Sequence, residues 1–193
     1  VSAMNLIPGS GEFAYASEII RREVRLGVEE PENMHNGAGV ADFIASLDQL
    51  VEDFPNLSHV NLIVGWFGTS TDCAQCEIRP GVELRGRKTR PRSWTVAGLD
   101  RESAYLISAD EEGRPSYGGT PDDQSVIQAI QALKARGLKV KLYPFLFMDA
   151  LGFPWRGRVT CSPEIDGSPA ASDAVAAFFG TDMQWRYNRF IKH

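Results

Sequence analysis

The stretch that decides the fold is His59-Val60-Asn61-Leu62-Ile63-Val64-Gly65-Trp66-Phe67. Its residues favour the β conformation, and from Leu62 onward they are almost continuously apolar. A run of this kind is typical of a strand that is buried on both faces of a parallel sheet. Since parallel strands need crossover connections, the fold class depends on which elements flank this run.

A helix is predicted immediately before this strand, over about 40–54. Apolar residues recur there at helical spacing, so they share one face. Pro55 ends the helix because a proline cannot continue the backbone hydrogen-bond ladder. Residues 1–38 carry no such pattern, and we interpret them as an N-terminal lead-in segment. The apolar stripe consists of Val40, Phe43, Ile44, Leu47, Leu50, Val51 and Phe54.

The segment that follows the strand is rich in loops, from Gly68 to about Gly119. It holds strand-like pieces at Ser93–Val96 and Ala104–Ser108, and Asp110–Pro115 is typical of a hairpin tip. Insertions after the carboxyl end of a strand are where (β/α)-barrel proteins elaborate a site. This segment is therefore a candidate site-bearing region.

A second helix is predicted to begin at Thr120-Pro121. Threonine is a favourable N-cap and proline suits the first helical position, while Asp122 and Asp123 lie near the positive end of the helix dipole. Gly137 is expected to end the helix in a left-handed conformation. The buried stripe consists of Val126, Ile127, Ile130 and Leu133.

A second buried strand is predicted over residues 139–149. Pro144 is awkward in a central strand and indicates a bulge or a strand end near Tyr143. A further helix follows at about 170–179. The order strand, helix, strand is typical of a parallel sheet or barrel.

Both ends of the chain are expected to be internal positions of a longer protein. The sequence begins at Val1 rather than at a methionine, and a terminal helix is predicted from near Asp182 to the last residue. Its apolar stripe shows no C-terminal stop signal. The stripe consists of Met183, Tyr187, Phe190 and Ile191.

Composition excludes several classes of protein. The 193 residues are 43% hydrophobic and 23% charged, which is ordinary for an α/β domain with a real core. A formal net charge of -5 argues against a general attraction to nucleic acid or to an anionic membrane. No apolar run approaches the roughly 20 residues that span a bilayer, and Val1–Asn5 does not resemble the start of a signal peptide.

A set of short strings, spread over nearly the whole chain, is distinctive. The strings are Pro31-Glu32-Asn33, Asp42-Phe43, Ser46-Leu47-Asp48-Gln49-Leu50, Val64-Gly65-Trp66-Phe67-Gly68, Tyr117-Gly118-Gly119-Thr120-Pro121-Asp122-Asp123, Tyr143-Pro144-Phe145, Met148-Asp149 and Pro154-Trp155-Arg156-Gly157-Arg158-Val159-Thr160. Together they resemble the barrel-like domain of a large tail-tip protein. That protein is the baseplate or "megatron" protein of gene transfer agents and related siphophage-like particles.

This resemblance implies a fold. It would be a partial TIM-like (β/α) barrel related to glycoside hydrolases, occupying residues 39–193, with a loop-rich insertion after an early strand. A full barrel usually needs about 250 residues, so the chain would supply only the first part of one.

The resemblance also implies a role. The chain would be a structural component at the distal end of the tail of a virion or gene transfer agent particle, contributing to host-cell attachment and DNA delivery. The implied partners are other tail and baseplate proteins, including the hub and further copies of the chain, with a host-surface glycan as a further candidate. No cofactor, transmembrane segment or sequence-specific nucleic-acid binding is implied.

The enzymatic alternative is a glycoside hydrolase that cuts host cell-wall or surface polysaccharide during penetration. Glycoside hydrolysis uses a pair of carboxylates. Asp149, at the carboxyl end of a predicted strand, is a candidate for one of them, and a bridge to Arg156 or Arg158 is its structural alternative. In barrels of this kind the pair usually lies on later strands, so we assign no catalytic residue and favour the structural role.

A group of residues near predicted strand ends are candidate glycan contacts. Aromatic rings there could stack on the apolar face of a sugar, and polar groups could bind its hydroxyls. Packing at the barrel mouth, or of an arginine on a neighbouring ring, is the alternative. The candidates are Trp66, Phe67, Asp149, Trp155, Arg156 and Arg158.

A basic run in the loop-rich segment is a candidate contact for a polyanion such as lipopolysaccharide, capsule or DNA. Neutralising phosphates with lysine and arginine would make such binding depend on salt. A solvated or subunit-facing loop is the alternative. The run contains Arg85, Arg87, Lys88, Arg90 and Arg92.

Cys73 and Cys76 have the spacing of half a zinc site or of a redox pair. A structural zinc needs four ligands, and no second pair with this spacing is present. A local disulfide or two plain loop thiols explain the pair better, so the metal site is only a weak candidate.

Overall fold

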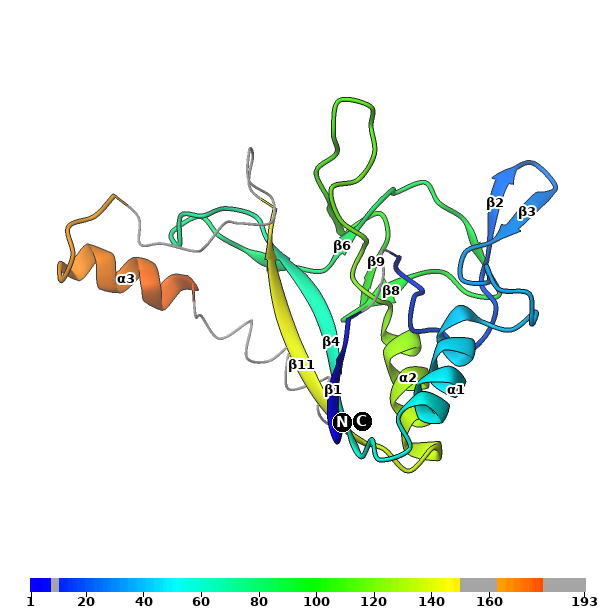
Figure 1. The fold of residues 1–193 in the computed structure, drawn as a ribbon. Coiled ribbons are helices and arrows are strands. Elements are labelled where there is room, and N and C mark those ends of the chain that lie inside the picture. The colour runs from blue at the N-terminus through cyan, green and yellow to red at the C-terminus, as the bar shows by residue number, and fades with distance from the viewer. Residues whose placement is uncertain (8–10, 150–162, 179–193) are drawn as a thin grey trace.

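A parallel sheet forms the centre of the molecule (Figure 1). The computed structural model describes residues 1–7, 11–149 and 163–178. Strands β1 (Ala3–Leu6), β4 (His59–Gly68) and β11 (Lys139–Met148) run parallel in the order β1-β4-β11. The short β5 (Ile78–Arg79) pairs antiparallel with the end of β4. The sequence predicts β4 and β11 to within a residue, whereas β1 lies in the segment interpreted as a lead-in.

Two helices, α1 (Asp42–Asp53) and α2 (Asp123–Ala135), pack against one face of this sheet (Figure 1). Both predicted helices are confirmed, and Gly137 has the expected positive φ of 77° after α2. The side chain of Asp122 caps α2 by accepting from the Ser125 N–H, so Asp122 and not Thr120 is the N-cap. The core beneath the helices contains Val60, Leu62, Val64 and Trp66 of β4, Leu47 of α1, and Val126, Ala129 and Leu133 of α2.

The remaining elements are small. One three-stranded sheet contains β2 (Arg21–Arg25), β3 (Val28–Pro31) and β7 (Thr89–Arg90), and two strand pairs join β6 (Gly81–Val82) to β10 (Tyr105–Leu106) and β8 (Thr95–Val96) to β9 (Leu99–Asp100). Helix α3 (Pro169–Phe178) matches the third predicted helix. The predicted terminal helix from Asp182 lies outside the described residues. Within the described ranges, no helix is both long and apolar enough to cross a membrane.

The expectation of a partial TIM-like, glycoside-hydrolase-like barrel is wrong for the described part of the chain. Its three parallel strands form an open sheet, and the small sheets do not continue it into a closed cylinder. The architecture is instead mixed α/β, with one mainly parallel sheet and several short strand pairs. Alternation of helix and strand predicts parallel pairing but says nothing about closure, because open and closed sheets share the same alternation.

The expectation of a second buried strand is also wrong, because most β11 residues are exposed or half-buried; among the described residues, β11 lies at the edge of the sheet. The backbone N–H of Lys139 donates to the carbonyl of Ser58, just before β4, and that of Asp149 donates to the carbonyl of Gly68, the last residue of β4. The backbone N–H and C=O groups of odd-numbered β11 residues therefore point toward β4. The nitrogen of Pro144 therefore points away from β4, where a missing N–H removes no hydrogen bond of the β4–β11 ladder. For this reason the register stays continuous from Lys139 to Met148, without the bulge expected near Tyr143.

The central strand, β4, is longer than β1, its neighbour on the side opposite β11. β4 has ten residues and β1 has four, so the β4 edge beyond Leu62 extends past β1. The Tyr15 hydroxyl lies 2.7 Å from the Ile63 carbonyl oxygen, and the Thr120 hydroxyl donates to the Gly65 carbonyl at 2.9 Å. Side chains from distant loops thus satisfy buried backbone groups that a longer β1 would have paired.

Replacing Thr120 by valine tests this arrangement. The change preserves shape but removes the hydroxyl that donates to Gly65 and accepts from the Gly81 N–H, so two buried backbone groups lose their partner. We expect the free energy of unfolding, measured by urea titration, to fall by about 3 kcal/mol. The control is Thr95→Val at an exposed position, which should change it by less than about 0.5 kcal/mol. Equal effects of the two substitutions would contradict the capping role.

Candidate functional site

Asp149 follows the carboxyl end of β11 and is buried. Its Oδ2 accepts from the Tyr105 hydroxyl at 2.9 Å and from the Ser108 N–H at 2.7 Å, while its Oδ1 accepts from the Ser108 hydroxyl at 2.5 Å. Both oxygens are therefore engaged by β10 and the segment that follows it. The bridge to Arg156 or Arg158 considered from the sequence lies outside the described residues, and Asp149 holds the loop to the sheet through Ser108.

An aromatic cluster surrounds this carboxylate. The Phe67 ring stacks on Phe147 at 5.7 Å, and Tyr117 contacts both rings at 5.6 and 5.1 Å. Burial, reinforced by the charge of Asp149, raises the pKa of Tyr117 to about 12. Burial also raises the pKa of Tyr105, and its hydrogen bond to Asp149 adds to the effect. Both phenols thus stay protonated at neutral pH and serve as donors.

The predicted glycan contacts that the structure describes are buried. Trp66 packs beneath the helices and Phe67 is fully buried, so neither ring has a free face. Trp155, Arg156 and Arg158 lie outside the described residues. The exposed rings are instead Tyr143 and Phe145 of β11, at 45% and 42%. The sequence analysis missed them because an edge strand with apolar side chains has the same apolar run as a buried one.

The basic run does not form one continuous surface. Arg87 turns inward to pair with Glu83 and Glu32, at 2.9 and 3.2 Å. Arg90 lies 3.3 Å from Glu29. Of the five basic residues, Arg85 and Lys88 are exposed and have no ion pair among the described residues. Salt bridges within the protein therefore neutralise much of the predicted polyanion site.

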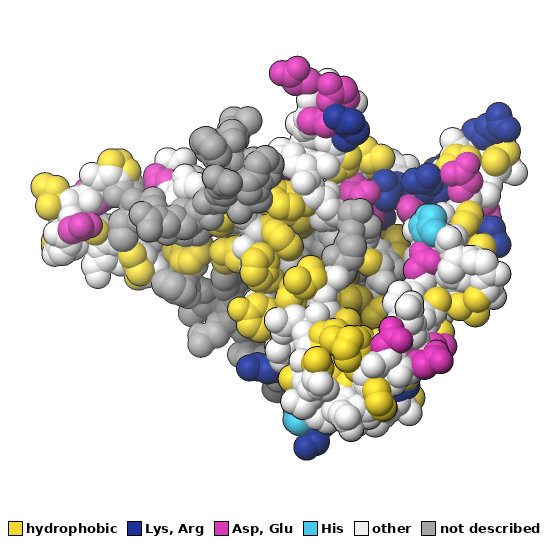
Figure 2. Space-filling view, viewed as in Figure 1, with side chains coloured by type: hydrophobic (Ala, Val, Ile, Leu, Met, Phe, Trp, Pro, Cys, Tyr) yellow, Lys and Arg dark blue, Asp and Glu magenta, His cyan; other side chains and the backbone are white. Residues whose placement is uncertain are grey.

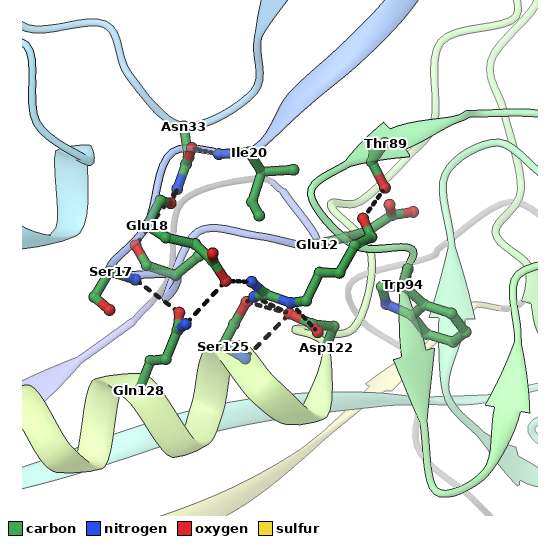
Figure 3. A network of polar contacts seen from close by, with 12 residues as sticks. Glu12, Ser17, Glu18, Ile20, Asn33, Thr89, Trp94, Asp122, Ser125 and Gln128 are labelled. Atoms are coloured by element: carbon green, nitrogen blue, oxygen red, sulfur yellow. Dashed lines mark hydrogen bonds and ion pairs between the residues drawn. The ribbon is translucent and has the colours of Figure 1, made fainter.

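Arg92 is the centre of a polar network that joins three distant segments. Figure 3 labels its partners Glu18, Asp122 and Ser125. Its guanidinium contacts Glu18, donates to Asp122 at 3.1 and 3.2 Å, and donates to Ser125 at 2.9 Å. Gln128 of α2 also donates to Glu18, at 3.0 Å. The N-terminal segment, the loop after β7 and the start of α2 are fixed together here, which is a structural use of charge.

A buried ion pair lies nearby. Arg101 donates to the Glu12 carboxylate at 2.5 and 2.9 Å, and the Glu83 N–H donates to it at 2.9 Å. Burial raises the pKa of Glu12 even though Arg101 acts against the rise. A Cβ on Gly119 would lie 2.3 Å from the Glu12 side chain, so only glycine allows this close approach. No local pattern in the sequence identifies this pair, because 89 positions separate its members.

Cys73 and Cys76 are buried free thiols, and their segment is close to the end of β4. Among the described residues, no cluster of His, Cys, Asp and Glu side chains is arranged to hold a metal ion. Cys161 lies outside these residues.

A pocket of about 420 Å³ lies between α1 and the segment after β1. Its walls include Tyr15, Phe43 and Leu47, and at its rim His35 Nδ1 lies 2.7 Å from Asp42. Although burial acts to raise the pKa of Asp42, hydrogen bonds from His35 and Asn36 outweigh it and hold that pKa below its ordinary value. His35 and Asp42 thus pair with each other at the rim of the pocket.

Comparison with known protein families and curated proteins identifies no relative. The chain matches no model of a known protein family, and a search of curated proteins finds no match. Inference about function therefore starts from the side-chain geometry and from the resemblance of the strings given above.

Asp123 provides a titratable group whose effect on stability can be measured. Its Oδ2 accepts from the Ala97 N–H at 2.9 Å, and its Oδ1 is buried without a hydrogen-bond partner among the described residues. Burial raises its pKa from 3.8 to about 6; the Ala97 bond opposes the rise and the charge of Asp122 adds to it. A raised folded-state pKa stabilises the protein below about pH 4, and this contribution is lost as the pH rises through about 6.

The Asp123→Asn variant should therefore gain stability relative to the wild type at pH 8 and gain little or none at pH 4. Urea unfolding of both proteins at the two pH values measures the difference. Asp110→Asn is a control whose effect on the free energy of unfolding should have the opposite sign, because hydrogen bonds from Arg114 hold the pKa of Asp110 below its ordinary value. A gain for Asp123→Asn that is the same at both pH values would show that the carboxylate is not destabilised in the folded state.

Proposed function

We propose that this chain is a non-catalytic structural module in the tail tip of a gene transfer agent or phage-like particle, contributing to host-cell attachment and DNA delivery. One observation carries the non-catalytic part. Asp149, the acid at the carboxyl end of β11, is buried and accepts hydrogen bonds on both oxygens. Hydrolysis of a glycosidic bond needs carboxyl groups that face the substrate. The buried acids described above instead hold loops in place.

The resemblance to the tail-tip family supports the assignment to a particle. Its strings include positions that join separate parts of the fold, among them Asn33, Thr120 and Asp122. Asn33 accepts from the Ile20 N–H and donates to the Glu18 carbonyl, at 2.8 and 2.9 Å. Thr120 caps the edge of β4, and Asp122 caps α2 and binds Arg92. A module whose role depends on shape would use its polar residues in this way.

The location in the particle can be tested by immunogold electron microscopy. Antibodies against the chain should label the distal end of the tail of intact particles. Particles from a strain that lacks the gene serve as the control for non-specific labelling. Gold on the capsid, or no gold on any particle from the producing strain, would overturn the assignment.

The non-catalytic role predicts a specific outcome for Asp149→Asn. An asparagine replaces one acceptor oxygen by an NH₂ group, which would face a donor from Ser108 or Tyr105. We expect the free energy of unfolding to fall by about 1–3 kcal/mol. Release of reducing sugar from host wall or surface polysaccharide should be undetectable for both proteins. The exposed Asp53→Asn is the stability control.

Clear sugar release by the wild-type chain, lost in a folded Asp149→Asn variant, would favour the hydrolase instead. Circular dichroism of the variant distinguishes this outcome from simple unfolding. The labelling experiment is independent of this result, since a hydrolase could also be carried at a tail tip.

A further inference from the structure

The sheet face opposite α1 and α2 is exposed along β11 in the described part of the chain. Lys139, Lys141, Tyr143 and Phe145 of β11 are exposed there, whereas Ile63 and Phe67 of β4, on the same face, are buried. Side chains alternate between the two faces of a strand, and the even-numbered residues of β4 pack beneath the helices. The register places odd-numbered residues of β1, β4 and β11 together on the other face. We define this open face by Asn5, Asn61, Lys139, Lys141, Tyr143, Phe145 and Phe147. Hydrophobic side chains gather over β11 in the space-filling view (Figure 2).

The carboxyl half of the open face is a fixed aromatic surface. The Phe147 ring lies over Gly65, where a Cβ would be only 2.3 Å from it. Phe145 packs edge-on against Phe147 at 4.9 Å, and Phe147 stacks on the buried Phe67. Because the inner rings are held by packing, the outer ring of Phe145 is positioned before any ligand arrives, which lowers the entropic cost of binding.

The amino half of the open face is polar and basic. Asn61 donates to the Asn5 side chain at 2.7 Å, and Lys139 and Lys141 are exposed. No aspartate or glutamate occupies an odd-numbered position of β1, β4 or β11. The face is therefore locally positive on a chain whose net charge is -5. Charge complementarity favours an anionic ligand here.

A ligand would lie on this face rather than extend the sheet at its edge. A strand added beside β11 would need a continuous ladder of backbone donors and acceptors. The nitrogen of Pro144 faces that edge and has no hydrogen to donate. Proline on an edge strand is one of the features that prevent pairing between sheets. This argues against a second copy of the chain joining edge to edge.

We propose that the open face binds an anionic polysaccharide of the polyuronate class. The apolar faces of sugar rings would stack on Tyr143 and Phe145, the carboxylates would lie near Lys139 and Lys141, and the asparagine amides would bind hydroxyls. Residues 139–147 span about 26 Å along the strand, enough for several sugar units. This inference builds on the proposed attachment role and names the class of its ligand.

Single-stranded nucleic acid is the competing ligand with rings and negative charge. Its binding depends on neutralising several phosphates, and the open face offers two lysines on an acidic chain. The paired amides of Asn5 and Asn61 match the hydroxyl groups of a sugar. These features favour the polyuronate.

The test is titration calorimetry of the full chain with hexagalacturonate. Phe145→Ala should weaken binding about tenfold, because a well-packed ring contact is worth about that factor. Lys141→Gln should weaken it about threefold and reduce its dependence on salt concentration. The matched controls, Val24→Ala at 43% exposure and Lys88→Gln in the basic run, should leave binding unchanged.

Several results would overturn the proposal. One is the absence of hexagalacturonate binding at millimolar concentration, and another is equal binding by the wild type and Phe145→Ala. Tighter binding of a thymidine oligonucleotide than of hexagalacturonate would identify the face as a nucleic-acid surface, and loss of binding in Lys88→Gln would move the site to the basic run. Immunogold labelling tests the tail location separately. Labelling at the tail tip without hexagalacturonate binding would therefore contradict the proposed ligand but not the structural role.

Discussion

The unequal length of two neighbouring strands is the constraint on which the rest of the fold depends. β4 extends past the end of β1, and its carbonyl groups at Ile63 and Gly65 are buried beyond the last paired residue. Buried carbonyls without partners would cost as much as lost hydrogen bonds. The hydroxyls of Tyr15 and Thr120 bind them, which fixes the segment after β1 and the segment before α2 against the same strand.

Ion pairs, one of them buried, then hold these segments together. Glu12 pairs with Arg101, and Arg92 joins Glu18 to Asp122 at the start of α2. Replacing buried ion pairs by apolar residues often costs little stability, but removing one partner leaves an uncompensated charge. Such pairs therefore favour one arrangement of the loops over others. This explains how a long segment with only short strands is held in place against the sheet.

The use of polar groups inside the molecule bears directly on function. Asp149, like the buried pairs, accepts from its neighbours and offers no free acid to a substrate. Among the described residues, the exposed rings on the sheet are Tyr143 and Phe145 of β11, beside Phe147, which lies over Gly65. A rigid interior and an open aromatic face together suit a module that binds through its shape, in agreement with the attachment role proposed for the tail tip.

The sequence by itself determined the elements that local periodicity encodes. The stripe of α1, the apolar run of β4 and the glycine after α2 are visible within short windows, since each reflects contacts repeated along one helix or strand. Tertiary structure alone decided that the sheet is open among the described residues, that β11 lies at its edge there, and that the Pro144 nitrogen points away from β4. It also decided that Glu12 meets Arg101, 89 positions away. Closure, edge position and distant ion pairs depend on which segments meet in space, and the spacing of residues along the chain does not record such meetings.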